Sequence, residues 1–349
     1  MKRVKVLVVD DSAFMRRILS DILKKEPRID VVSTARNGKE GVEKIKGLTP
    51  DVVTLDIEMP VMGGLEALTY IMKQAPIPVV MVSSLTKEGA ARTLEAIHLG
   101  AVDFIHKPSG AISIDMKSMD KEIIKKILTA GKARVSPFND RLNRQVDLPE
   151  DIQTQGNIIA IGTSTGGPRA LQQVLRTLPC NLPAPIVVVQ HMPSGFTKSL
   201  AERLDKISEI SVKEAGHMEE LHNGVAYVAP GGYHMEIVQE NKVLKIHLNQ
   251  NPPVNGHRPS VNVMFSSLAR LEKVTTTAVV MTGMGTDGLT GLLELKEMRK
   301  ATFSIAEDES TCIVYGMPKA IHQSGLADEV QPLTNISQRI VQSLQRKRR

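Results

Sequence analysis

The stretch Asn157-Ile-Ile-Ala-Ile-Gly-Thr-Ser-Thr-Gly-Gly-Pro168 is an apolar run that breaks into glycines around one serine. Its aliphatic residues predict a buried strand, and its glycines predict a sharp turn into the helical pattern that follows. Residues 162–166 have the G-x-S-x-G spacing of a nucleophile turn, in which small neighbours lift a serine hydroxyl clear of the sheet edge. Ser164 is therefore a candidate nucleophile, although a glycine-rich turn after a strand also serves as a plain connection or as a phosphate site.

The rest of the second half predicts more strands in alternation with helices. Further apolar or β-branched runs follow at 186–190, 224–228, 234–238, 243–248, 277–282 and 302–306. Continuous aliphatic runs suit strands that are buried on both faces of a parallel sheet. The part from 224 to 248 is typical of antiparallel hairpins placed between helical units. We therefore expect a doubly wound, mainly parallel α/β domain with an inserted antiparallel hairpin region.

Polar residues of complementary chemistry follow three of these strands. Ser164 follows the first strand, His191 the second and Asp287 a later aliphatic run that leads into a glycine-rich loop. A serine hydroxyl becomes nucleophilic when an imidazole takes its proton and a carboxylate orients that imidazole. The N–H of Met284, in the same loop, is placed to stabilise an oxyanion. The ordinary alternatives are that Asp287 caps the helix that follows it and that the loop binds phosphate. His257 and four other histidines follow no predicted strand and are not expected at the site.

The first half also alternates short β-branched runs with amphipathic helical stretches. The runs lie at 4–9, 31–35, 52–55, 79–82 and 104–106. This alternation predicts a second doubly wound parallel sheet. A flavodoxin-like strand order, 2-1-3-4-5, places the first and third strands side by side at the edge where the functional crevice lies.

Charged and hydroxyl side chains gather at these strand ends. Asp10 and Asp11 follow the first strand, Asp56 the third, Ser83 the fourth and Lys107 the fifth. Carboxylates brought together in a half-buried pocket repel one another, so they take up protons or hold a hard cation. Oxygen ligands with room for water suit Mg²⁺, and a nearby lysine can neutralise a phosphoryl group. Taken singly, each of these residues has an ordinary explanation as a helix cap or a surface turn.

Length and composition limit the remaining possibilities. A chain of 349 residues suits two domains, and loss of periodicity predicts domains at 1–129 and 156–349 joined by a linker at 130–155. The net charge of +6 identifies no partner, and without basic residues interleaved with aromatics we expect no nucleic-acid binding. No apolar run reaches membrane-spanning length and the chain begins with a strand pattern, so we expect a cytoplasmic protein without membrane insertion. Cys180 and Cys312 are expected to be reduced and structural.

Motifs of the first half carry a family likeness. They are Val8-Val-Asp-Asp-Ser12, Thr54-Leu-Asp-Ile-Glu-Met-Pro60 with Gly63-Gly64, Met81-Val-Ser-Ser84 and Phe104-Ile-His-Lys-Pro108. They resemble the receiver domain of two-component response regulators over its whole length. The resemblance implies that Asp56 accepts a phosphoryl group from a histidine kinase. It implies a Mg²⁺ site made by Asp10 (through water), Asp11, Asp56 and the backbone carbonyl of Glu58. It also implies switch positions at Ser83, Phe104 and Lys107, with Lys107 contacting the phosphoryl group.

The second half carries a separate set of motifs. They are Ile161-Gly-Thr-Ser-Thr-Gly-Gly-Pro168, Gln190-His-Met-Pro193 with Phe196-Thr197, Val228-Ala-Pro-Gly-Gly-Tyr-His-Met235, His257-Arg-Pro-Ser-Val261 and Met281-Thr-Gly-Met-Gly-Thr-Asp-Gly288. They resemble the catalytic domain of chemotaxis protein-glutamate methylesterases. Thr163 departs from the family pattern, where a smaller residue is expected, and is predicted to crowd the nucleophile turn without altering the proposed triad.

Together the two resemblances imply one activity. They imply a hydrolase that removes methyl groups from glutamyl γ-methyl esters of chemoreceptors and deamidates receptor glutamines, through Ser164, His191, Asp287 and the N–H of Met284. This chemistry needs no cofactor. The receiver would cover the site until Asp56 is phosphorylated. Two rival classes are an adaptor with a catalytically idle docking domain, and a transcription factor, which the strand-rich second half disfavours.

Overall fold

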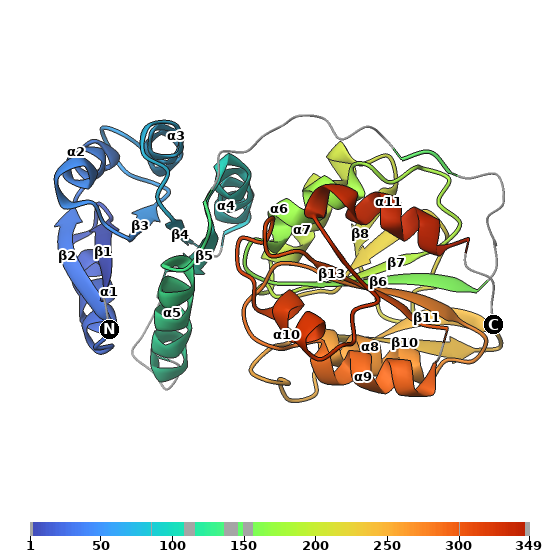
Figure 1. Ribbon diagram of the computed structural model, residues 1–349. Helices are drawn as coiled ribbons and strands as arrows, with labels where there is room; N and C mark the ends of the chain where they lie inside the picture. The colour runs from blue at the N-terminus through green and yellow to red at the C-terminus, as the bar shows by residue number, and fades with distance from the viewer. Residues whose placement is uncertain are drawn as a thin grey trace. The chain divides into compact units, whose positions relative to one another are not determined.

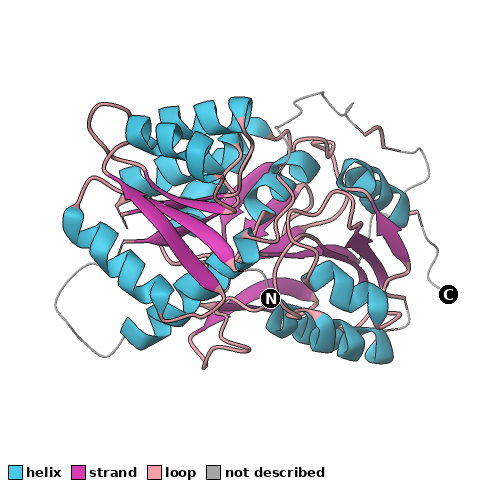
Figure 2. Ribbon diagram, turned by 60° about the vertical axis from the view of Figure 1, so that its left-hand side comes forward, coloured by secondary structure: helices cyan, strands magenta, loops and turns pink. Residues whose placement is uncertain are grey.

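The structure is a computed structural model that describes residues 3–84, 86–107, 116–135, 146–148, 156–299 and 301–345. The chain divides into two compact units, Met1–Asp140 and Arg141–Arg349. Most of the linker expected at 130–155 lies outside the described residues, so its bounds and those of the two domains stay predictions. Within it, the N–H of Val146 donates to the carbonyl of Thr177 at 3.1 Å. Helices flank the strands of both units (Figure 2).

The first unit is a five-stranded parallel sheet with helices on both faces. Its strands run in the order β2-β1-β3-β4-β5, which confirms the predicted flavodoxin-like arrangement. Every residue of β3 and β4 is buried, as their continuous β-branched and aliphatic runs predict. The elements are β1 (Val4–Val9), α1 (Ala13–Lys24), β2 (Ile29–Ala35), α2 (Gly38–Leu48), β3 (Val52–Asp56), α3 (Gly64–Gln74), β4 (Val79–Ser83), α4 (Lys87–Leu99), β5 (Asp103–His106) and α5 (Met116–Ala130).

The second unit is a seven-stranded sheet in which every pairing is parallel, with a separate antiparallel hairpin, β10–β11. Its sheet order is β14-β13-β12-β6-β7-β9-β8. Helices α6, α7 and α11 lie on one face and α8, α9 and α10 on the other, with the hairpin beside α8 (Figure 1). The elements are β6 (Asn157–Thr163), α6 (Gly167–Leu175), β7 (Ile186–Gln190), α7 (Phe196–Ile207), β8 (Ser211–Glu214), β9 (Val225–Val228), β10 (His234–Glu240), β11 (Val243–Asn249), α8 (Val261–Ala269), β12 (Thr275–Val280), α9 (Leu289–Met298), β13 (Phe303–Glu307), α10 (Met317–Gln323), β14 (Glu329–Gln331) and α11 (Leu333–Ser343).

One prediction about this unit was wrong in part. The stretch from 224 to 248 was expected to form hairpins throughout, but β9 is a parallel strand of the main sheet, paired with both β7 and β8. Ala226 and Tyr227 are buried on opposite faces of that sheet. Over so few residues, the sequence of a buried parallel strand looks the same as that of one strand of a hairpin. Strand β8 escaped prediction because its Ser-Val-Lys-Glu sequence buries only Val212. Strand β14 and helix α10 were also missed.

Both sheets have a point where the chain leaves neighbouring strands in opposite directions. In the first unit this point lies between β1 and β3, because β1 leads to β2 on one side while β3 leads to β4 on the other. In the second unit it lies between β6, which leads to β7, and β12, which leads to β13. Loops diverge at such a point and leave a crevice outside the carboxyl ends of the strands. Any polar residues that follow β1, β3, β6 and β12 are therefore placed to line a site.

Candidate functional site

Strand register brings Ser164 and His191 together. Thr163 of β6 pairs with Gln190 of β7, so the next residue on each strand leaves the sheet at the same level. The His191 N–H donates to the Thr163 carbonyl at 3.1 Å. The buried Gln190 amide donates from Nε2 to the carbonyls of both Ser164 (2.9 Å) and His191 (3.0 Å). These bonds hold the two backbones side by side at the sheet edge.

The structure also brings Asp287 to His191, 96 residues away in sequence. Asp287 Oδ2 lies 2.8 Å from His191 Nε2 and accepts the Val261 N–H at 2.7 Å. Its Oδ1 accepts the Ser260 hydroxyl at 2.8 Å and the Asn262 N–H at 3.1 Å. Burial alone would raise the pKa of Asp287, but its bond to His191 and these further donors together lower that pKa below its ordinary value.

Asp287 does cap a helix, but not the one that follows it in sequence. The Val261 and Asn262 N–H groups that it accepts belong to the first turn of α8, where a negative charge is favourable. In return, Asn262 Oδ1 accepts the Gly288 and Gly291 N–H groups at the start of α9, each at 2.9 Å. The predicted alternative, a cap on the helix that follows Asp287, is therefore wrong, and Asp287 instead caps α8 while it contacts His191.

The orientation of His191 leaves one ring nitrogen available. With Nε2 on Asp287, the buried Nδ1 has no hydrogen-bond partner among the described residues. A neutral imidazole protonated at Nε2 carries its lone pair at Nδ1, which is the state that a general base requires. The structure records no hydrogen bond between the Ser164 hydroxyl and His191 within its described ranges. The side chain of His191 is 6% exposed, so solvent barely reaches the ring.

His257, which was not expected at the site, stacks on His191. Their ring centroids are 3.8 Å apart and their planes differ by 5°. His257 therefore covers one face of the imidazole that contacts Asp287. Only its place in the His-Arg-Pro-Ser-Val motif just before α8 could have pointed to it, because no strand end precedes it.

The glycine-rich loop after β12 packs against the nucleophile turn. A Cβ added at Gly283 would lie 2.7 Å from Ser164 Cβ, so only glycine allows this approach. The Gly283 N–H donates to the Val314 carbonyl at 3.0 Å, and its carbonyl accepts the Met317 N–H at 2.8 Å. These bonds fix the backbone of Gly283, which leads directly into Met284. Its expected role as an oxyanion donor stays a prediction.

Thr163 fits its position without the predicted crowding. Its buried hydroxyl donates to the Thr282 carbonyl at 3.0 Å and so links the ends of β6 and β12. Space for it exists because Gly167 has no side chain: a Cβ there would lie 2.4 Å from Thr163 Oγ1. Thr163, although larger than the residue expected there, thus adds a hydrogen bond between the ends of β6 and β12.

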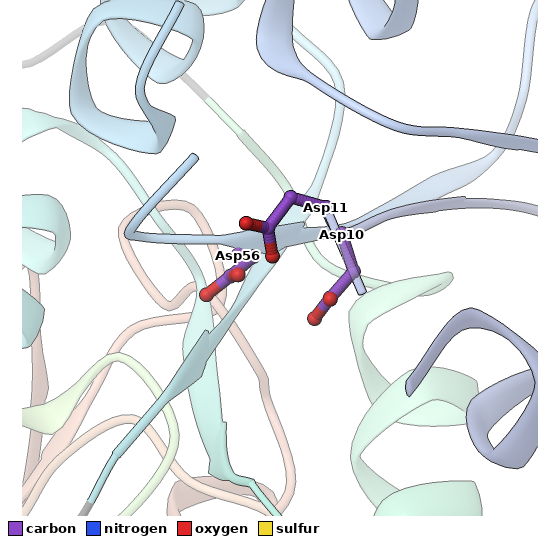
Figure 3. A group of neighbouring side chains, drawn as sticks. All are labelled: Asp10, Asp11 and Asp56. Carbon is purple, nitrogen blue, oxygen red and sulfur yellow. The ribbon is translucent and has the colours of Figure 1, made fainter. Parts of the chain in front are cut away.

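The acidic residues of the first unit also come together, as predicted. Ligand oxygens of Asp10, Asp11 and Asp56 all lie within 4.8 Å of one another, at the ends of β1 and β3 (Figure 3). Lys107 Nζ lies 2.7 Å from Asp56 Oδ2 and 3.7 Å from Asp10 Oδ2. The N–H of Glu58 donates to Asp56 Oδ1 at 3.4 Å. Asp10 and Asp56 are buried, whereas Asp11 is exposed.

This acidic cluster fits a divalent cation. Burial, with the charge of Asp10, raises the pKa of Asp56 to about 6, despite the opposing effect of Lys107. Burial likewise raises the pKa of Asp10, and its buried Oδ2 accepts no hydrogen bond from the described residues. Crowded carboxylates, one with a buried oxygen that accepts no hydrogen bond from the described residues, form the donor set that a hard cation such as Mg²⁺ prefers. Receiver domains generally bind Mg²⁺ at such a cluster.

The two remaining predicted switch residues are held by other elements. The Ser83 hydroxyl accepts the Thr93 hydroxyl at 2.7 Å and lies 3.2 Å from the carbonyl of Gly89, so it faces α4. Ser83, Asp56 and Lys107 line one small cavity of about 20 Å³. Phe104 is buried, and Lys126 Nζ lies 4.9 Å from the centre of its ring. Their roles as switches stay predictions.

Comparison with known proteins assigns each of the two units to a known family. A family model described as CheB methylesterase matches residues 159–340, and one described as response regulator receiver domain matches residues 6–117. The crystal structure of the Thermotoga maritima CheB methylesterase catalytic domain matches at a TM-score of 0.52 and 45% identity, covering 54% of this chain and 98% of that one. The fold and the sites thus define a response regulator that carries an enzymatic α/β domain.

Curated relatives extend this match to the full length. The protein-glutamate methylesterase/protein-glutamine glutaminase of Oceanobacillus iheyensis is 50% identical over 99% of this chain and 100% of its own. The protein of that name from Geobacillus kaustophilus is 52% identical over 98% of this chain and 99% of its own. The chain belongs to the CheB methylesterase family, in the form that also carries a receiver domain. No helix in the described ranges has the length and apolarity needed to cross a membrane.

Proposed function

We propose that this protein is a phosphorylation-activated hydrolase that removes methyl groups from glutamyl γ-methyl esters of chemoreceptors and deamidates receptor glutamines. The names of its relatives favour this activity over an adaptor with an idle second domain. A chemotaxis histidine kinase supplies the phosphoryl group. Because the substrate sites lie on the cytoplasmic helices of the receptors, the protein acts in the cytoplasm.

The proposed chemistry uses the contact between His191 and Asp287 beside Ser164. His191 Nδ1 takes the hydroxyl proton as Ser164 attacks the side-chain carbonyl of the receptor ester. Asp287 fixes the tautomer through Nε2 and stabilises the imidazolium that forms. The Met284 N–H stabilises the tetrahedral oxyanion. His191 then gives its proton to the leaving methanol, or to ammonia, and water hydrolyses the acyl-enzyme by the same steps.

The observation that carries this proposal is the 2.8 Å contact between His191 Nε2 and Asp287, because it leaves Nδ1 without a hydrogen-bond partner among the described residues and so free to act as the base for Ser164. The test is methanol release from methylated receptor membranes by the full-length Ser164→Ala protein. We expect a fall of at least about 1,000-fold, with phosphoryl incorporation at Asp56 unchanged. Ser324→Ala, at an exposed serine of the same unit, is the matched control. Normal release by Ser164→Ala would remove Ser164 from the mechanism.

The receiver supplies the control of this activity. Asp56 is the acceptor of the phosphoryl group, and Lys107, already 2.7 Å from it, contacts the added oxygens. Asp11, Asp56, the carbonyl of Glu58 and, through water, Asp10 would hold Mg²⁺, which would neutralise charge that builds up on the phosphoryl group. Phosphorylation raises turnover only if the phosphorylated receiver favours the active arrangement of the protein by a finite free energy.

This control has a direct test. Turnover of the intact chain is measured with and without a small-molecule phosphodonor, and Asp56→Asn serves as the variant that cannot be modified. We expect activation of the wild type and none of Asp56→Asn. Equal turnover of the wild type in both states, with Asp56 shown to be phosphorylated, would contradict the regulatory part of the proposal.

A further inference from the structure

A buried glutamate that takes no part in the proposed chemistry lies behind the nucleophile turn. Glu307 is the last residue of β13 and is 0% exposed. Its Oε2 accepts the Thr282 N–H at 2.7 Å, and its Oε1 accepts the Thr311 hydroxyl at 3.0 Å. Burial, with the charge of Asp308, raises its pKa to about 7, against the lowering effect of its bonds to Thr282, Thr311 and Cys312. Burying an ionisable group costs free energy that an apolar side chain would not cost, so packing alone does not account for a glutamate at this position.

The Glu307 side chain supplies a hydrogen-bond acceptor just beyond the point where the backbone pairing of β12 and β13 ends. The last register pair between β12 and β13 joins Val280 to Ala306. Thr282 lies two residues beyond that pair, so its N–H has no partner from the neighbouring strand. The Glu307 side chain reaches forward and supplies the acceptor that the ladder lacks. It therefore fixes the direction of the Thr282 peptide at the sheet edge.

Thr282 in turn holds the backbone of the nucleophile. Its carbonyl accepts the Ser164 N–H at 3.0 Å and the Thr163 hydroxyl at 3.0 Å. Its own hydroxyl donates to the Thr165 carbonyl at 3.0 Å and accepts the Val314 N–H at 3.0 Å. Thr282 thus bonds to three consecutive residues around the nucleophile. It also precedes Gly283, which packs on Ser164.

We propose that Glu307 is a positioning residue for Ser164, which acts by holding the Thr282 peptide that anchors the nucleophile turn and leads into the Met284 loop. The inference rests on the proposed function, because it assigns a role in the same reaction. Glu307 does not touch the substrate. A small displacement of a nucleophile lowers the rate of the chemical step far more than substrate affinity.

Three substitutions at Glu307 in the full-length protein test this role. Glu307→Gln keeps an acceptor for the Thr282 N–H, and its amide N–H can donate to the Thr311 hydroxyl, which can turn toward the Asp308 carbonyl 3.3 Å away. Glu307→Met fills similar space without an acceptor. We expect Glu307→Gln to retain kcat within about twofold and Glu307→Met to lose about 10- to 100-fold in kcat, with KM changed little in either. The rate at which a phosphonate probe labels Ser164 should fall in parallel.

Glu307→Asp keeps the charge but is one methylene too short to bond both partners. If Glu307→Met does not fold, the Asp variant decides, because it fits the same space; a fall in kcat at constant KM is expected. Wild-type kcat in all folded variants would overturn the inference. So would equal losses in Gln and Met, which would show that charge matters and the acceptor does not. Methanol release by the wild type is measured first, and its absence would contradict the proposed function. If the wild type releases methanol and the Glu307 variants have wild-type kcat, only the positioning role is contradicted.

Discussion

Asp56 and Asp287 are both buried carboxylates at the carboxyl edge of a parallel sheet, one in each unit, and their surroundings are opposite. Asp56 shares its pocket with two other carboxylates and one ammonium group, and its pKa is raised to about 6. Asp287 accepts four hydrogen bonds from described residues, and its pKa is lowered.

The difference shows that burial alone does not decide whether the pKa of a carboxylate is raised or lowered. The neighbouring charges and hydrogen-bond donors decide it. Asp56 sits where its negative charge is costly without a cation, which suits a residue that must bind a metal ion and accept a phosphoryl group. Asp287 is surrounded by donors, which suits a residue that must stay ionised and hold an imidazole still. The same substitution, aspartate to asparagine, should therefore have opposite consequences at the two sites.

The largest expected effect is at Asp287. Asparagine would present an NH₂ group to donors that now point at a carboxylate, and it would no longer fix the tautomer of His191. We expect kcat for methanol release to fall about 1,000-fold or more and the free energy of unfolding to fall by about 2–4 kcal/mol. Steady-state kinetics and urea unfolding measure the two effects. An Asp287→Asn protein that is as stable as the wild type would break the comparison.

The next effect concerns the cation at the acidic cluster. Removal of Mg²⁺ with EDTA, or Asp11→Asn, should slow phosphoryl incorporation at Asp56 by about 100-fold, because the crowded negative charge is then uncompensated. Incorporation from a labelled small-molecule phosphodonor is the measurement. Asp21→Asn, on the exposed side of α1, is the control and should behave like the wild type. Full incorporation in EDTA would show that the cluster works without a cation.

Glu307 offers a third kind of buried carboxylate, and its pKa gives a pH-dependent prediction. Because folding raises that pKa from 4.5 to about 7, the stability that Glu307 contributes is fully present below pH 4.5 and is lost as the pH rises through about 7. Relative to the wild type, Glu307→Gln should gain stability between pH 5 and 8, by at most about 3 kcal/mol. Urea unfolding across this range measures the difference. Glu309→Gln, at an exposed neighbour, controls for the loss of one charge, and a difference that stays constant with pH would contradict the prediction.

The smallest effect is at Asp56 itself. In the absence of Mg²⁺, Asp56→Asn should raise the free energy of unfolding of the receiver by about 1 kcal/mol, because it removes one of three crowded negative charges. Thermal or urea unfolding of the full-length protein in EDTA measures it. Asp30→Asn, at an exposed strand position, should change little. Destabilisation by Asp56→Asn would mean that its bond to Lys107 outweighs the repulsion.

Sequence reasoning reached the fold and the residues at strand ends because continuous aliphatic runs and the residues after them follow local rules. It placed Ser164, His191 and Asp287 at one edge, and the structure brings His191 and Asp287 within hydrogen-bond distance. It could not find Glu307 or His257, because their importance comes from contacts with residues far away in the chain. It also misplaced β9, since a four-residue strand carries no sign of whether its neighbours run parallel to it.

Asp287 both caps α8 and contacts His191, and this affects how related sequences should be interpreted. Its carboxylate starts α8 while Asn262 starts α9, so the aspartate is part of the scaffold as well as of the proposed reaction. A descendant that had lost its esterase activity would still be stabilised by an acid at this position, because the acid accepts the N–H groups at the start of α8. The presence of that aspartate alone is therefore poor evidence for activity in a related protein, and the serine of the nucleophile turn is the more informative residue.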